Sequence, residues 1–505
     1  MFALLAGAAL AQAPLAAQSL GADHPFVSDL PIHGELRLRA DHLGIPVVDD
    51  LGTPSERRAW GTSRLRVGAE YSRGLLGGEL ELEAFSARWG GGTPLGTDYA
   101  PDVFAIDRTG GGSELAVVMP RQAWLSVGGR RGLARVGAQT FTWGTGMLAN
   151  DGAGDPVFGD AVRGSVVARA LGVLTPWRGT PERGALQGLS FLTAFDAVLR
   201  DDNADLFRGD LALQGVVGVR TDGPRWQGGL LGVGRFQRDR LDPYHPLEQP
   251  HTWAFPVDGH LRVQLSDPEA PQTVGLEGEV VGLLGSTERT WTDETVREGA
   301  RIRGGGFVAR VRYDHAELRL TGLLEGGGAS GDNDGRDAVV RSFSMHSDHN
   351  VGLILFEELL PLLTARAVDR AADPALTGVP SPSGRFAVNQ GQVTNALYLY
   401  PTIRWRFVEA AEARLGVMTA RTAGDLVDVY QSALSGGYNT TPGGRTPGRR
   451  GLGSEVLLGT RTTLPVGITR LDLGAEGALF LPGPALDGLA LGPLATVRGR
   501  LDYRW

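Results

Sequence analysis

The chain has 505 residues and a formal net charge of −8, and every one of its 49 basic residues is arginine. It contains no cysteine and no lysine, which excludes disulfides, thiolate zinc sites and lysine Schiff-base chemistry. The 75 glycines are about twice the usual share, and the negative balance gives no indication of a nucleic-acid partner.

Residues 1–17 have the pattern of a secretory signal peptide. The stretch Phe2–Leu10 is apolar, and small residues follow it as far as Ala17. An apolar core before a small-residue cleavage site is typical of exported proteins. No basic residue precedes the apolar stretch, so an ordinary buried helix is the alternative. We expect residues 1–17 to be removed and residues 18–505 to form a single domain.

The rest of the chain is dominated by a period of two residues, which is the period of a β-strand. The segment 62–72 places leucine and valine on one face and Arg64 and Arg66 on the other. The segments 79–84 and 396–407 repeat this division into an apolar and a charged face. These runs of roughly 9 to 14 residues exceed the usual five or six, and they suit a tilted crossing of a membrane.

The connections between the predicted strands alternate between short turns and long polar segments. The long ones run over about 41–61, 90–119, 143–160, 239–253, 326–391 and 424–452. Alternating lengths are typical of an up-and-down antiparallel barrel in a bacterial outer membrane, with short periplasmic turns and longer outer loops. We predict an all-β transmembrane barrel of about 18 strands, within a range of 16 to 20, because residues 342–369 fit either two strands or a loop and a helix. A soluble sandwich or jelly roll is the alternative.

Several predicted strands carry two arginines on one face, opposite an apolar face. Arginines on the charged face of a barrel strand project into the lumen, where they affect which solutes pass. The predicted selectivity residues are Arg37, Arg39, Arg64, Arg66, Arg301, Arg303, Arg404 and Arg406. One hypothesis is a constriction that favours anions. The other is salt bridging between strands, for which Glu79, Glu81 and Glu83 are the candidate partners of Arg64 and Arg66.

A metal site is only weakly indicated. Asp332, Asp334 and Asp337 form a short acidic cluster of the kind that binds calcium. An EF-hand loop would need glycine at the position of Asp337 and glutamate at the position of Phe343, so the pattern fails. We expect a solvated loop, no bound metal and no cofactor.

The last nine residues, VRGRLDYRW, alternate strictly and end on Tyr503 and Trp505. This ending resembles the C-terminal strand by which the outer-membrane assembly machinery recognises its barrels. In that signal a glycine stands where this chain has Arg500, and Gly499 is one residue out of place. The resemblance implies an assembly role for Tyr503 and Trp505.

Two further blocks resemble a known group of proteins. They are AQTFTWGTGMLANDG at 138–152 and SFSMHSDHNVGLILFEEL at 342–359, and they look like those of a myxobacterial-type family of uncharacterised outer-membrane barrels. The overall layout and a short ASGD loop also resemble alginate-export porins, in which an arginine-rich lumen passes an anionic polymer. These resemblances imply an outer-membrane location and a barrel fold. They assign no catalytic residue to this chain.

We therefore expect an outer-membrane porin or exporter that passes small or polymeric polar solutes, with anions as a candidate class. Its expected partners are outer-membrane lipid, the barrel-assembly machinery and the solute, without nucleic acid. We expect no enzymatic activity. An outer-membrane enzyme and a structural or adhesive barrel are the alternatives, because a catalytic triad scattered over several strands leaves no local motif.

Overall fold

A computed structural model describes residues 31–55, 58–89, 118–241, 249–289, 299–377 and 384–505, so the predicted signal peptide lies outside the described residues. The strands are β1 (Ile32–Leu43), β2 (Ala59–Arg73), β3 (Leu76–Trp89), β4 (Met119–Gly129), β5 (Gly132–Thr140), β6 (Val166–Leu174), β7 (Leu189–Arg200), β8 (Leu211–Asp222), β9 (Trp226–Arg238), β10 (His251–Gln264), β11 (Gln272–Thr287), β12 (Ala300–His315), β13 (Leu320–Ala329), β14 (Val339–Val340), β15 (Ala396–Val408), β16 (Ala411–Thr422), β17 (Gly451–Val466), β18 (Thr469–Pro482) and β19 (Leu494–Arg504).

The helical segments are short by comparison with the strands. They are η1 (Pro181–Gly188), η2 (Leu206–Arg208), η4 (Leu355–Leu359), α1 (Leu360–Ala372), α2 (Pro374–Thr377), η5 (Gly384–Ala387), α3 (Val429–Leu434) and η6 (Pro484–Leu486). No helix in the described part of the chain is long and apolar enough to cross a membrane.

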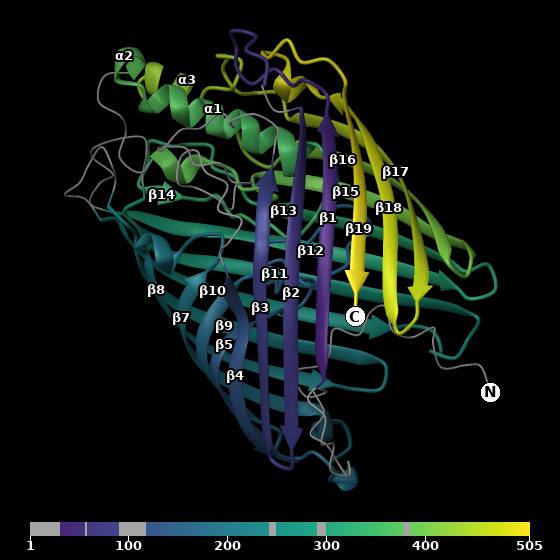
Figure 1. Ribbon diagram of the computed structural model, residues 1–505. Helices are drawn as coiled ribbons and strands as arrows, with labels where there is room; N and C mark the ends of the chain where they lie inside the picture. The colour runs from purple at the N-terminus through teal and green to yellow at the C-terminus, as the bar shows by residue number, and fades with distance from the viewer. Residues whose placement is uncertain (1–30, 56–57, 90–117, 242–248, 290–298, 378–383) are drawn as a thin grey trace.

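The long strands form one closed antiparallel sheet (Figure 1). Each strand pairs with the next along the chain, β13 pairs with β15, and β19 returns to pair with β1 from Leu43↔Thr496 to Glu35↔Arg504. The two-residue β14 lies beside β12 in parallel and takes no part in the closure. The predicted closed antiparallel barrel of 18 strands is therefore confirmed for the described residues.

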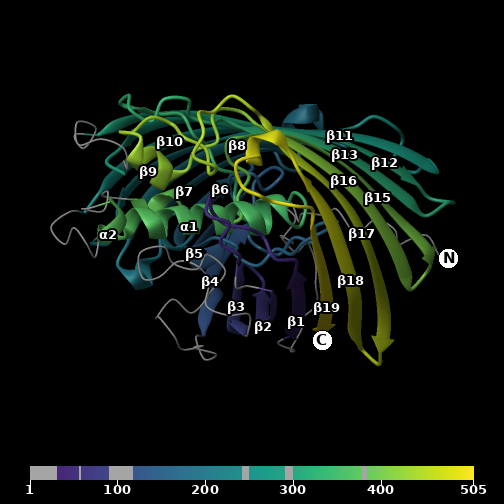
Figure 2. The ribbon, with the colours of Figure 1, turned by 90° about the horizontal axis from the view of Figure 1, so that it is seen from above.

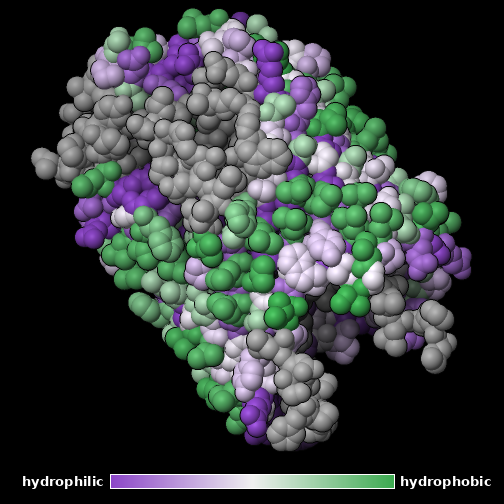
Figure 3. Space-filling view, viewed as in Figure 1, coloured by the Kyte–Doolittle hydropathy of each residue, from purple (hydrophilic) through white to green (hydrophobic). Residues whose placement is uncertain are grey.

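The outer face of the barrel is apolar along most of its height. Side chains of one parity are exposed, among them Val217, Val280 and Leu458 at 62–63%. Hydrophobic residues cover much of the strand surface in Figure 3, while hydrophilic ones lie mainly toward its two ends. Such a face suits hydrocarbon, and a closed sheet leaves no unpaired edge in it.

The two ends of the barrel differ as the sequence predicts. Tight turns at one end, such as those after Arg73, Gly129 and Val466, join strands into hairpins. Long segments emerge at the other end. We call the end with the tight turns the turn end and the end with the long segments the loop end. The region 342–369, which allowed two interpretations, forms η4 and α1 rather than two strands.

The interior of the barrel is largely filled by these long segments. Helix α1 crosses the opening that the strands surround when the molecule is seen from the loop end (Figure 2). The main apolar core lies around residues 353–363, where Leu353, Ile354 and Leu355 are fully buried. The protein therefore has a barrel wall and a folded filling, and the filling determines what space remains.

One wall carboxylate holds this filling in place. Glu455 of β17 is fully buried and accepts hydrogen bonds from the main-chain N–H groups of Leu353, Ile354 and Leu355 at 2.9, 3.2 and 2.6 Å. A carboxylate that receives several N–H groups at the start of a helical turn stabilises that turn through charge-assisted hydrogen bonds.

Glu455→Gln should loosen this turn while leaving the barrel intact. The amide offers one acceptor oxygen and turns a donor toward the N–H groups, so local opening should become easier by about 1.5–3 kcal/mol. Amide hydrogen exchange at residues 353–355 should accelerate about tenfold or more. Glu288→Gln, at an exposed side chain near the loop end, is the control. Equal exchange in both variants would show that Glu455 does not hold the turn.

Candidate permeation path

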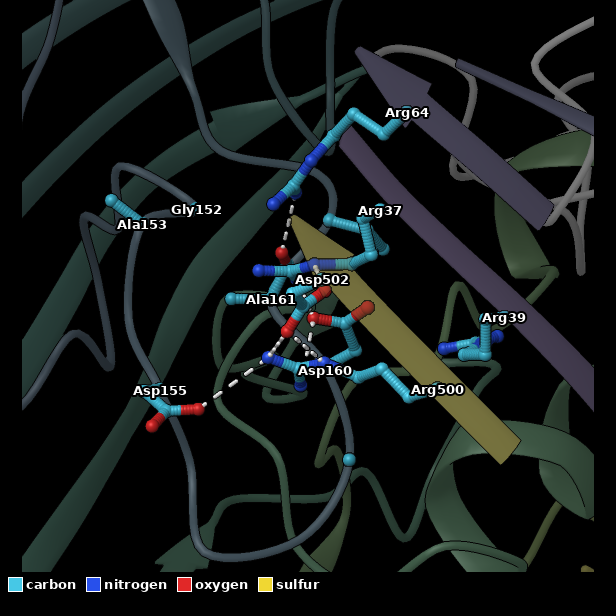
Figure 4. Close-up of polar contacts among 12 residues, drawn as sticks. Arg37, Arg39, Arg64, Gly152, Ala153, Asp155, Asp160, Ala161, Arg500 and Asp502 are labelled. Atoms are coloured by element: carbon cyan, nitrogen blue, oxygen red, sulfur yellow. Dashed lines mark hydrogen bonds and ion pairs between the residues drawn. The ribbon is translucent and has the colours of Figure 1, made fainter. Parts of the chain in front are cut away.

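An inward loop, residues 141–165, folds from the loop end into the barrel and lies against an arginine-rich part of the wall (Figure 4). Arg64 donates to the carbonyl of Ala161 at 2.9 Å, and Arg66 donates to the carbonyl of Gly152 at 3.3 Å. Further wall arginines donate to loop carbonyls, namely Arg121 to Asp151 and Arg414 to Val157. The guanidinium groups therefore bind the chain's own backbone.

Two carboxylates of the inward loop face the same arginines. Asp160 pairs with Arg37 and lies 3.6 Å from Arg500. Asp155 lies 2.6 Å from Arg461 and 3.6 Å from Arg500. Burial acts to raise the pKa of Asp155, but the positive charges of Arg461 and Arg500 outweigh it and hold that pKa below its ordinary value. Both loop carboxylates are thus engaged with the wall.

Four predicted selectivity residues lie in this region with their side chains inward. Arg37, Arg39, Arg64 and Arg66 are buried, with 5–7% exposure. Their carboxylate partners are, in that order, Asp502 at 2.8 Å, Asp41 at 2.8 Å, Glu35 at 2.6 Å and Glu83 at 2.8 Å. Each of these four arginines therefore forms a salt bridge, as one of the two hypotheses expected. Glu83 was among the partners named from the sequence.

The other four predicted selectivity residues do not all point into the lumen. Arg404 points inward and lies 3.7 Å from Glu412, whereas Arg406 is exposed close to the turn end. The expected inward placement of Arg301 and Arg303 is wrong: both are exposed and share a face with the outward Phe307. They lie at the loop end of β12, where an outward arginine can meet water or lipid headgroups rather than hydrocarbon.

The acidic cluster is already engaged by a guanidinium. Arg341 lies 2.6 Å from Asp337 and 3.4 Å from Asp332, and the side chain of Asp334 accepts the main-chain N–H of Arg336. In the described residues no group of three or more histidine or acidic side chains could hold a metal ion. A cation on Asp332 and Asp337 would have to displace Arg341.

Asp348 joins the inward loop to the segment before α1, and sequence analysis missed it. Its carboxylate accepts hydrogen bonds from the N–H groups of Val162, Arg163 and Gly164 at 2.8, 2.9 and 2.7 Å. No periodic pattern marks a carboxylate in an irregular segment. The only sequence signal was the pair of blocks 138–152 and 342–359, which here lie in contact, since His346 donates its main-chain N–H to the carbonyl of Met147.

In the described part of the barrel, two adjoining cavities lie between its ends. The outer cavity, toward the loop end, measures about 600 Å³ and is lined by β6, β8–β12 and the inward segments. The inner cavity, toward the turn end, measures about 190 Å³. Its lining residues include Glu79 and His260. Phe141 and Arg169 line both, so these two side chains stand where the cavities meet.

The junction between the cavities is built from a neutralised arginine and an aromatic ring. Arg169 donates to both oxygens of Asp196, at 2.7 and 2.8 Å, and Gln214 donates to one of the same oxygens. The guanidinium of Arg169 lies 4.7 Å from the centre of the Phe141 ring, which stacks against Trp143. At the junction the charge of Arg169 is therefore matched by Asp196, and its guanidinium is held by hydrogen bonds and by the Phe141 ring.

A serine and a histidine meet in the wall of the outer cavity. Ser165 Oγ lies 3.0 Å from His346 Nε2, as in a nucleophile–base pair. However, His346 Nδ1 accepts the main-chain N–H of Asp348, so the proton is on Nε2 and the ring donates to the serine. A general base would have to accept from Ser165 instead, and this pair is arranged the wrong way round for nucleophilic catalysis.

Comparison with known proteins bears on the fold alone. No family model matches the chain, and no curated protein matches it. Among solved structures, Pseudomonas aeruginosa OpdK with vanillate matches at 12% identity and a TM-score of 0.50, over 94% of this chain and 98% of that one. A second structure of the same protein, OccK1 (OpdK), matches at 13% and 0.50 over the same shares. Acinetobacter baumannii OccAB1 matches at 8% and 0.50, over 94% and 96%. The chain thus has the fold of the Occ and Opd outer-membrane porins.

Proposed function

We propose that the chain is an outer-membrane porin that passes small polar solutes. The observation that carries this proposal is the pair of adjoining cavities inside a closed barrel, meeting at Phe141 and Arg169. A closed sheet with an apolar outer face and a polar interior is the architecture that allows polar solutes to cross hydrocarbon.

The size of the outer cavity sets the size of the solute. A volume of about 600 Å³ lies within the range of sites that enclose a small molecule. The structure of OpdK that shares this fold holds vanillate, a small aromatic acid, and we transfer only its size class to this chain. A polymer, as in the alginate-export resemblance, fits poorly because α1 and the inward loop fill most of the lumen.

The route to the membrane belongs to the same proposal. Residues 1–17 would direct export, and Tyr503 and Trp505 would be recognised by the barrel-assembly machinery. Trp505 exchanges main-chain hydrogen bonds with Gly34 at 2.9 and 3.1 Å, so the last residue of the printed sequence takes part in closing the barrel. The resemblance of blocks 138–152 and 342–359 to a myxobacterial-type family remains part of this proposal and rests on their sequences alone.

The test of the proposed function is electrical. The full chain, reconstituted in planar bilayers, should give discrete single-channel steps in KCl. A barrel with intact strand content by circular dichroism that gives no steps, and passes no solute into vesicles, would sink the proposal and favour a structural or adhesive role.

Phe141→Ala should raise the single-channel conductance on the order of twofold, because the narrowest segment dominates the resistance of a pore. The matched control is Phe195→Ala, since Phe195 lies on β7, faces outward and is 60% exposed. Both variants lose the same side chain, so a change confined to Phe141→Ala locates the constriction. Equal conductances in the two variants would place it elsewhere.

Removing the loop carboxylates should make the open current noisier. In Asp155→Asn combined with Asp160→Asn, the inward loop loses its ion pairs with Arg37, Arg461 and Arg500. Loss of such hydrogen bonds to charged groups costs about 1.5–3 kcal/mol each, so the loop should leave the wall more often. Single-channel recordings at neutral pH should show more frequent conductance changes. Asp487→Asn, which removes an exposed pair with Arg449, is the control and should behave as wild type.

A further inference from the structure

Each arginine of the outer cavity is matched by a carboxylate. Arg235 pairs with Asp201, Arg169 pairs with Asp196, and Arg289 donates to Asp239 at 2.6 Å. These are the three arginines that line the cavity in the described part of the chain. An anionic solute would therefore have to displace a carboxylate of the wall in order to reach any of them, and each exchange would leave that carboxylate without its partner.

The remaining carboxylates of the cavity are held by neutral donors or by Arg341. Asp202 accepts from the N–H and hydroxyl of Ser347 at 2.8 and 2.6 Å. Asp332 accepts the main-chain N–H of Arg341, and Asp425 accepts from the amide of Asn439 at 3.2 Å. These carboxylates add to the negative side of the balance, which further disfavours an anion. Neutral hydrogen-bond donors do not cancel the charge of these carboxylates, so the exclusion that the paired charges impose applies to anions and not to cations.

Uncharged hydrogen-bonding groups make up much of the rest of the polar lining. They come from three inward segments and from the wall, and include Ser165, Thr252, Thr364, Asn389, Gln392 and Asn439. Amides and hydroxyls both donate and accept, so they complement hydroxyl groups, which also do both. A site built to bind hydroxyls in this way discriminates strongly against analogues that lack them.

Two aromatic rings are placed among these polar groups. Phe141 lies at the inner end of the cavity and Phe386 lies in η5, and each has a guanidinium over its ring, at 4.7 Å for Arg169 and 4.0 Å for Arg289. The rings offer apolar surface beside hydrogen-bonding groups. The C–H faces of a sugar ring have the same character, since they are apolar while the hydroxyls project around the rim.

We propose that the outer cavity selects uncharged, polyhydroxylated solutes of mono- to disaccharide size over anionic solutes of the same size. This inference rests on the proposed porin function and names its solute class. The inner cavity continues the same balance, because Arg220 pairs with Asp222 at 3.1 Å and His260 with Glu277 at 3.1 Å. A neutral solute can cross both cavities without breaking an ion pair.

The test compares three sugars that share one ring and differ in charge. Entry of labelled glucose, glucuronate and glucosamine into vesicles containing the full chain is measured at neutral pH and equal concentration. Glucose should enter several-fold faster than glucuronate, and glucosamine serves as the comparison with a charge of the opposite sign. Faster entry of glucuronate than of glucose would overturn the selectivity while leaving the porin function standing. Entry of none of the three, together with silent bilayers, would overturn both.

A charge variant separates selection by the cavity from selection by size. Asp201→Asn keeps the shape of the side chain but leaves the charge of Arg235 unmatched, so glucuronate entry relative to glucose should rise about threefold or more, a change of less than ~1 kcal/mol. Asp267→Asn removes a partner of Arg225 at an exposed turn and serves as the control. An unchanged ratio in Asp201→Asn, with glucose entry preserved, would mean that the paired charges of this cavity do not set selectivity.

Discussion

An arginine that points into an enclosed barrel must lie beside an acceptor, because a guanidinium taken out of water without a partner costs several kcal/mol. The interior of this protein follows from that requirement. Arg37 meets Asp502 of the adjacent strand β19 and Asp160 of the inward loop, and Arg64 meets Glu35 and the carbonyl of Ala161. The rows of arginines therefore do two things at once: they join neighbouring strands and they bind the loop that narrows the lumen.

The barrel itself was predictable because lipid imposes it residue by residue. An apolar side chain at every second position and short turns alternating with long segments are local features, and both can be counted in the sequence. The same rule, applied strictly, would have corrected one error. On β12, Arg301 and Arg303 have odd numbers, whereas Arg310 and Arg312 have even ones. A regular strand therefore turns these two pairs of arginines to opposite faces, and only one pair can point inward. The structure turns Arg310 and Arg312 inward and leaves the earlier pair outside.

The contents of the barrel were not predictable in the same way. The bond between Arg37 and Asp160 joins residues 123 positions apart, and the bond between Asp348 and Gly164 spans 184. Asp160 and Asp348 lie in irregular segments, where no period indicates which way a side chain points. Composition revealed many arginines and many carboxylates, but the pairing between them is a property of the closed barrel. The sequence could therefore offer only two hypotheses about selectivity, one with arginines free to attract anions and one with arginines held in salt bridges.

The paired arginines that hold the loop are not spread evenly around the barrel. The arginines that hold the inward loop come mainly from β1, β2, β16, β17 and β19, whereas the outer cavity is lined by β6 and β8–β12. One side of the wall is thus occupied by the chain's own carboxylates and carbonyls, and the open space lies against the other side. On that open side each arginine is matched by a carboxylate, so the wall offers an anionic solute no unmatched positive charge. Discrimination between solutes then depends on short-range contacts, namely the hydrogen bonds and ring faces of the cavity, and the sequence determinants of the solute should be sought there rather than among the arginine rows.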